Sequence, residues 1–179
     1  EPYNSRLGTT IAEARILHND QNIEMPITDG KKVMWADADG IKEALGLANM
    51  KNPIPAGFIT FSNKLEVPIE FRSDYLLGKE GAHLNISGIS GLATKTSYAM
   101  FLLSSIQQKY ANTDEKITTI IFNVKGNDLL AIDEHPGNLT EKIKSDWERC
   151  GLEAKPFDNV NYLYPYSSSQ SHTNSHAHP

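Results

Sequence analysis

The sequence is short of several features that would define whole classes of protein. Cys150 is the only cysteine, so no disulfide can form within the chain, and a reducing compartment fits. No apolar run approaches the roughly 20 residues that span a bilayer, and no signal peptide is visible. We therefore expect a cytoplasmic protein without a membrane partner.

Basic charge is also scarce. The 17 lysines and arginines are outnumbered by 22 aspartates and glutamates, which gives a net charge of −5 over 179 residues. Binding of nucleic acid through bulk charge alone is therefore not indicated, although a local basic patch in an assembly is compatible with this count. A hydrophobic content of 39% is enough for one large or two small globular domains.

Residues 1–75 show a pattern of short strands. Strands are predicted at 9–18 and 31–36, a short helix at 38–45, and a β-hairpin from 57–61 and 65–71. Asp37 or Asp39 is expected to cap the helix. Pro68 predicts that the second hairpin strand is an edge strand or carries a bulge. We expect this part to be a small β-rich domain, either a barrel or a sandwich.

Residues 76–166 have longer and more apolar segments. A strand at 84–87, a long helix ending near Tyr110 and a strand at 117–124 follow one another. The last of these is almost continuously β-branched, which is typical of a central parallel strand. Together they predict a βαβ unit with a right-handed crossover, and thus an α/β fold for this half.

The rest of this half predicts one more helix and one more strand. An amphipathic helix is expected at 139–150, where Asn138 begins a stretch with the spacing of a capping box and Gly151 ends the helix. Cys150 lies on its apolar face and is predicted to be a core residue rather than a nucleophile. A strand is predicted at 159–164. Residues 167–179 are expected to form a flexible polar segment, whose histidines could alternatively bind a transition metal loosely: His172, His176 and His178.

The turn between the strand at 84–87 and the long helix is the candidate functional site. A strand that enters a glycine-containing turn before a helix can direct backbone N–H groups and the positive end of the helix dipole at one anion. Lys95 would contact the outer phosphates of a nucleotide, and the Thr96 hydroxyl would bind Mg²⁺. The glycines are displaced from their standard positions, which Ile89 and Thr94 occupy. Two interpretations stay open: a phosphate-binding loop with a different path, or an ordinary strand-to-helix turn.

Two further charged residues follow the predicted strand at 117–124. Ligands of open parallel sheets gather at the carboxyl ends of strands, so Lys125 and Asp128 are expected on the same rim as the turn, or else in a solvated loop. Lys95 is the candidate catalytic residue and Thr96 the candidate metal ligand. The candidate cofactor-binding residues are Gly88, Gly91, Leu92, Ala93, Thr94, Lys95, Thr96, Ser97, Lys125 and Asp128.

Three segments resemble one family. The strand-rich first half, the stretch LNISGISGLATKTSYAMFLL and the stretch IIFNVKGNDLL resemble the HerA–FtsK class of P-loop ATPases, in particular HerA-like proteins. The resemblance implies a small N-terminal β-barrel followed by an incomplete RecA-like three-layer α/β core. It also implies ATP and Mg²⁺ as cofactors, with Lys95 as the nucleotide lysine and Thr96 as the Mg²⁺ ligand. Members form hexameric rings that move double-stranded DNA, often beside a nuclease.

The chain departs from this family because no strand carries a convincing Walker B motif. Apolar residues precede Asp133 and Glu134, but they follow the strand at 117–124 too closely for a parallel neighbour. We interpret residues 129–134 as a helical turn or loop. The motif is then expected beyond Pro179, and this chain would be the inactive front part of an ATPase. Two alternatives are a non-catalytic docking module with a degenerate loop, and a small P-loop NTPase or kinase that uses Asp133 or Glu134.

Overall fold

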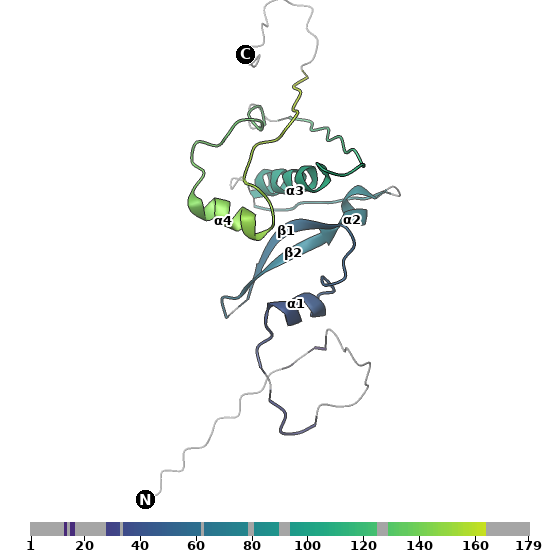
Figure 1. Ribbon diagram of the computed structural model, residues 1–179, viewed down its shortest axis with the longest axis vertical. Coiled ribbons are helices and arrows are strands. Elements are labelled where there is room, and N and C mark those ends of the chain that lie inside the picture. The colour runs from purple at the N-terminus through teal and green to yellow at the C-terminus, as the bar shows by residue number, and fades with distance from the viewer. Residues whose placement is uncertain are drawn as a thin grey trace, which may run out of the picture. The chain divides into compact units, whose positions relative to one another are not determined.

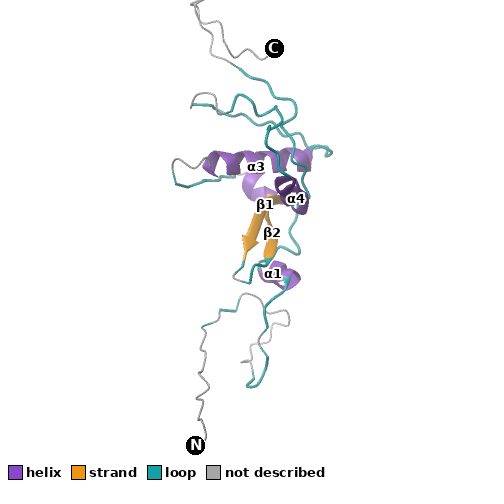
Figure 2. Cartoon of the chain, turned by 90° about the vertical axis from the view of Figure 1, so that its left-hand side faces the viewer, coloured by secondary structure: helices purple, strands orange, loops and turns teal. Residues whose placement is uncertain are grey.

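The computed structural model describes residues 13, 15–16, 28–32, 34–61, 63–78, 81–89, 94–124 and 129–163. The chain divides into two units, Glu1–Asn49 and Met50–Pro179, and each is described by itself. The described residues form four α-helices and a two-stranded antiparallel sheet, which bears out a mixed α and β composition (Figures 1 and 2). None of the described helices has the length and apolar character needed to cross a bilayer.

The first unit contains the helix α1 (Ala38–Ala44). The Asp37 side chain accepts a hydrogen bond of 2.9 Å from the Gly40 amide and caps the helix, as predicted. The helix ends because Gly46 adopts φ 70°, a left-handed conformation that glycine enters without a Cβ clash. Both ends of α1 are therefore set by local sequence.

The second unit begins with a β-hairpin formed by β1 (Pro53–Thr60) and β2 (Glu66–Arg72). Ile54 of β1 and Val67 of β2 are both fully buried. The hairpin was predicted, and in the described part of the chain both of its strands are edge strands, one of the two possibilities predicted from Pro68. The pairing register shifts between Pro55 and Gly57, so the irregularity lies in β1 rather than at Pro68. The short helix α2 (Ser73–Leu77) follows β2 directly.

The helix α3 (Thr94–Tyr110) packs on β1 and buries Leu102 and Ile106 (Figure 2). Its fully buried Ser105 hydroxyl donates to the Pro55 carbonyl at 2.9 Å, and the Tyr98 hydroxyl donates to the Ala56 carbonyl at 3.0 Å. Successive carbonyls of a regular strand point in opposite directions. Because the register shift lies here, two consecutive carbonyls of β1 can bond the same helix.

Two neighbouring glutamines of α3 hold the chain that follows α4. The Gln108 amide donates to the Glu153 carbonyl at 2.9 Å and accepts from the Glu153 amide at 2.8 Å. Gln107 makes the same two-way pairing with Asp158, at 2.8 and 3.2 Å. Each side chain therefore satisfies both backbone groups of a residue that is outside regular secondary structure.

The helix α4 (Glu141–Arg149) packs through aromatic and charged side chains. The rings of Trp147 and Phe101 meet edge to face at 5.1 Å between centroids. Arg149 forms an ion pair with Glu66 at 3.0 Å and lies 4.4 Å from the Phe58 ring centroid. These contacts connect α4 with both α3 and the hairpin.

The predicted boundaries of α4 are largely correct. Thr140, rather than Asn138, is the N-cap, and its hydroxyl accepts from the Ile143 amide at 3.3 Å. Gly151 ends the helix with φ 69°, as expected. Cys150 is half-buried, and burial raises the pKa of its thiol, which fits a packing residue rather than a nucleophile.

Four predicted strands do not form in the structure. The residues described within 31–36, 84–87, 117–124 and 159–163 have no strand assignment. A strand needs a neighbour to take up its backbone hydrogen bonds, and the only pairing among the described residues is that of β1 with β2. A βαβ unit therefore does not appear in the described part of the chain.

The structure also groups the elements differently from the sequence. The hairpin lies in the same unit as α3, whereas the predicted division at residues 75 and 76 falls inside α2. The predicted strand at 9–18 and the polar segment at 167–179 lie outside the described residues, apart from residues 13, 15 and 16.

Candidate functional site

The first turn of α3 presents four polar side chains to solvent. Thr94, Lys95, Thr96 and Ser97 are all exposed, and no acidic residue lies in this turn. The first amides of any helix lack partners within the helix, and the dipole adds partial positive charge at this end. An anion at this position would meet a cationic side chain and hydroxyl groups without a carboxylate in the same turn.

Gly88 lies directly against the start of α3. A Cβ placed on Gly88 would lie 3.0 Å from Cγ of Lys95 and 3.5 Å from Oγ1 of Thr94. The chain before the turn therefore returns to the helix terminus, so the two ends of the turn are neighbours in space. Any residue larger than glycine at position 88 would place its side chain against the aliphatic part of Lys95.

The contacts of α3 with the hairpin fix where this terminus lies. Tyr98 is one helical turn after Thr94, and its hydrogen bond to Ala56 holds the first part of the helix on β1. Burial raises the pKa of the Tyr98 hydroxyl, so the hydroxyl stays neutral and remains a donor well above pH 7. The terminus is thus held by a rigid element rather than by a loop.

The structure brings together about half of the predicted site. Gly88 and the residues of the first turn of α3 are neighbours. The other five candidates lie outside the described residues: Gly91, Leu92, Ala93, Lys125 and Asp128. Their placement stays a prediction.

The segment that contains Asp133 and Glu134 is a turn, as interpreted from the sequence. The Tyr162 hydroxyl donates to Asp133 Oδ1 at 2.7 Å and accepts from the Ile132 amide at 3.2 Å. The Ile132 carbonyl accepts from the Phe157 amide at 3.0 Å. Burial and the bond to the Asp133 carboxylate raise the pKa of Tyr162 to about 12. These contacts join the turn to the chain after α4 and give Asp133 a structural partner.

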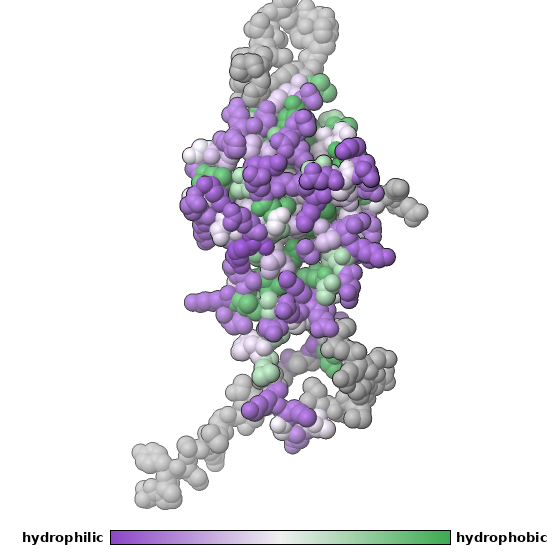
Figure 3. Space-filling view, in the orientation of Figure 1, coloured by the Kyte–Doolittle hydropathy of each residue, from purple (hydrophilic) through white to green (hydrophobic). Residues whose placement is uncertain are grey.

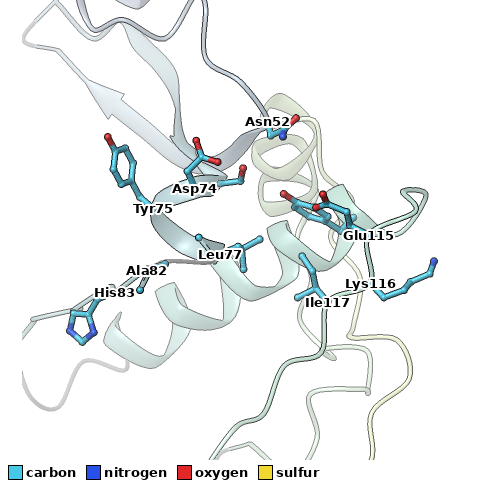
Figure 4. A pocket seen from close by; sticks show the side chains of 13 residues that line it. Asn52, Asp74, Tyr75, Leu77, Ala82, His83, Glu115, Lys116 and Ile117 are labelled. Carbon is cyan, nitrogen blue, oxygen red and sulfur yellow. The ribbon is translucent and has the colours of Figure 1, made fainter.

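An open depression with a volume of about 1060 Å³ lies beside α2 and the C-terminal end of α3. Leu77 and Ile117 lie in its middle, and His83 and Lys116 lie at opposite ends (Figure 4). Its lining residues come from four separate stretches of sequence, so no local motif could have predicted it. Among the residues that the structure describes, no cluster of three or more histidine, cysteine or acidic side chains could hold a metal ion.

No protein-family model matches the chain, and neither the curated proteins nor the solved structures include a match.

Proposed function

We propose that this chain binds the phosphates of ATP, with Mg²⁺, at the N-terminus of α3. The observation that carries the proposal is the contact of Gly88 with Lys95 at the start of a firmly anchored helix. Lys95 supplies a positive charge, Thr96 a hydroxyl ligand for Mg²⁺, and the first amides of the helix supply donors. Binding would be electrostatic and positional rather than covalent.

Calorimetric titration with ATP and Mg²⁺ tests this proposal. Lys95→Ala removes a charge-assisted hydrogen bond worth about 1.5–3 kcal/mol, so the affinity falls by about 10- to 100-fold. Lys109→Ala is the matched control, because Lys109 is an exposed lysine in the last turn of the same helix. Equal affinity for the wild type and Lys95→Ala would reject the site.

The finer proposal is that the chain is the front part of a HerA-like DNA translocase or helicase. It rests on the resemblance of residues 84–103 and 120–130 to that family. In this proposal the first half belongs to a small β-barrel, and residues 84–87 and 117–124 become strands of a RecA-like core. The partners would be further copies in a hexameric ring, double-stranded DNA and a nuclease.

A non-catalytic docking module is the second candidate. It is favoured by large apolar side chains that stay exposed after α3, in the uncharged stretch 117–124. Titration with nucleotide separates the two candidates, because a docking module with a degenerate loop would bind no ATP. The small NTPase or kinase that uses Asp133 is less well supported, since Tyr162 already donates to that carboxylate.

A further inference from the structure

The open depression beside α2 and the C-terminal end of α3 combines an apolar floor with a polar rim. Leu77 and Ala82 form the floor, and Asn52, Asp74 and Glu115 lie on one side above it (Figure 4). Elsewhere on the face of the molecule in view, apolar side chains reach the surface in small areas among hydrophilic ones (Figure 3). The volume of about 1060 Å³ is at the upper end of the range for small-molecule pockets. Such a lining suits a small molecule with one polar and one apolar end.

Ser73, the first residue of α2, lines this depression with a hydroxyl that has no hydrogen-bond partner. The residue is only 4% exposed, and no other group that the structure describes bonds its side chain. In the same part of the chain, no side-chain polar atom is both fully enclosed and unbonded, so the hydroxyl keeps its remaining access toward the depression. Buried polar groups are normally hydrogen-bonded. A ligand that donates to the Ser73 hydroxyl would supply the missing partner.

The charge on this side of the depression is negative. Glu115 is exposed and has no ion-pair partner among the described residues, whereas Asp74 pairs with Arg72 at 2.7 Å. The Lys116 ammonium donates to the Thr113 carbonyl at 3.3 Å, and the Lys116 side chain points outward (Figure 4). The C-terminal end of α3 adds the partial negative charge of the helix dipole. The unbalanced Glu115 carboxylate therefore favours a cation.

We propose that this depression binds a primary amine on a short aliphatic chain, whose ammonium group donates to Ser73 and Glu115. An ammonium group has three N–H donors and no acceptor, which matches a hydroxyl and a carboxylate that are both without donors. The aliphatic chain would cover Leu77. A metal ion fits less well, because no three histidine, cysteine or acidic side chains of the described residues come together. His83 lies at the far end of the depression, away from Glu115 (Figure 4).

The amine site is separate from the proposed nucleotide site. The two lie at opposite ends of α3, a helix of 17 residues that is about 25 Å long at a rise of about 1.5 Å per residue. The first turn of α3 carries Lys95 for an anion, whereas Glu115 lies beyond the last turn for a cation. The inference therefore goes beyond the proposed function. Loss of ATP binding in Lys95→Ala would leave amine binding unchanged.

Titration of the isotope-labelled full chain with n-pentylammonium chloride, followed by NMR, tests the site. An amine of this size should bind with a dissociation constant on the order of millimolar. The ionic strength is held constant with sodium chloride, because added salt screens exposed charges. The backbone amide signals of residues 73–77 and 110–116 should shift together and saturate. The same titration with n-pentanol, which has the same chain without a charge, should give at least about tenfold weaker binding.

Two variants test the two groups that hold the ammonium. Glu115→Gln keeps the shape of the side chain and removes its charge, so the amine affinity should fall about tenfold. Ser73→Ala should lower the amine affinity about fivefold. It should leave the urea midpoint of unfolding unchanged or higher, because the hydroxyl has no partner in the protein to lose, whereas a purely structural serine would lower that midpoint. Glu148→Gln is the matched control, since Glu148 is exposed on α4 and lies outside the depression.

A second ligand distinguishes the two sources of such an amine. N-acetyl-lysinamide presents the ammonium group as a lysine side chain of another protein would, whereas n-pentylamine represents a free amine. Saturable binding of either compound supports the site, and the tighter of the two identifies the source. Three results would overturn the proposal: no signal shifts with either amine, equal affinity for n-pentanol and n-pentylamine, or equal amine affinity of the wild type, Glu115→Gln and Ser73→Ala.

Discussion

The hydrogen bond from Ser105 to Pro55 gives the sharpest prediction about what holds α3 on the hairpin. The Ser105 hydroxyl is fully buried and donates at 2.9 Å to a carbonyl of a buried residue. Ser105→Ala removes the donor and leaves the acceptor in place. Loss of a hydrogen bond to a buried group costs about 1–3 kcal/mol of the free energy of unfolding.

The higher helix propensity of alanine partly offsets this loss, and a control variant on another helix cancels that effect. Alanine is favoured over serine inside a helix by about 0.5 kcal/mol. Ser145→Ala on α4 receives the same gain, but Ser145 is exposed. The difference between the two variants therefore isolates the buried hydrogen bond and should be about 1–3 kcal/mol.

Urea unfolding followed by circular dichroism at 222 nm measures this difference. With a denaturant slope of about 1–3 kcal/mol per molar, the midpoint of Ser105→Ala should lie on the order of 1 M below that of Ser145→Ala. In a Trp35→Phe background, fluorescence of the remaining Trp147, whose ring contacts Phe101 of α3, gives a second reading in the same unit. Coincident midpoints for the two variants would refute the reasoning.

Three other predictions concern the rest of the second unit. The pKa of Tyr162 is raised to about 12 from its ordinary 10.0. The neutral hydroxyl therefore contributes to the free energy of unfolding fully below about pH 10, and this contribution is lost as the pH rises through 12. In Tyr162→Phe, the free energy of unfolding measured from pH 9 to 12 should no longer show this loss. Gly151→Ala should lower the free energy of unfolding by about 1 kcal/mol because Gly151 has φ 69°, and an unchanged thermal midpoint would contradict this. The chain alone should hydrolyse ATP no faster than its Lys95→Ala variant, with or without double-stranded DNA. ATP hydrolysis that is lost in both Lys95→Ala and Asp133→Asn would contradict this and would indicate that the Asp133 carboxylate binds Mg²⁺.

Local signals in the sequence determined the hairpin and the helices α1, α3 and α4, whereas the short helix α2 was not predicted. The cap at Asp37, the helix that begins near Lys95 and the stop at Gly151 depend on side chains within a few residues of the helix ends. The two hairpin strands are joined by a short turn, so their pairing is nearly local. Part of the candidate site was predictable for the same reason, since Thr94–Ser97 are consecutive residues at a helix start.

Tertiary structure decided the features that join distant residues. Arg149 meets Glu66, and the glutamines at 107 and 108 hold backbone groups at 158 and 153. No local pattern specifies such partners, because a side chain's neighbours depend on how the elements pack. The close approach of Gly88 to Lys95 is likewise visible only once the chain has turned back.

The segment 117–124 shows the difference most clearly. Its β-branched sequence favours an extended strand, but a strand forms only where another strand takes up its backbone hydrogen bonds. The described residues supply no such neighbour, so residues 117–124 do not form a strand despite their β propensity. Propensity is a property of the residues themselves, whereas pairing needs a second strand. For this reason the sequence determined the local hairpin, while only the tertiary structure decided whether the segment 117–124 forms a strand.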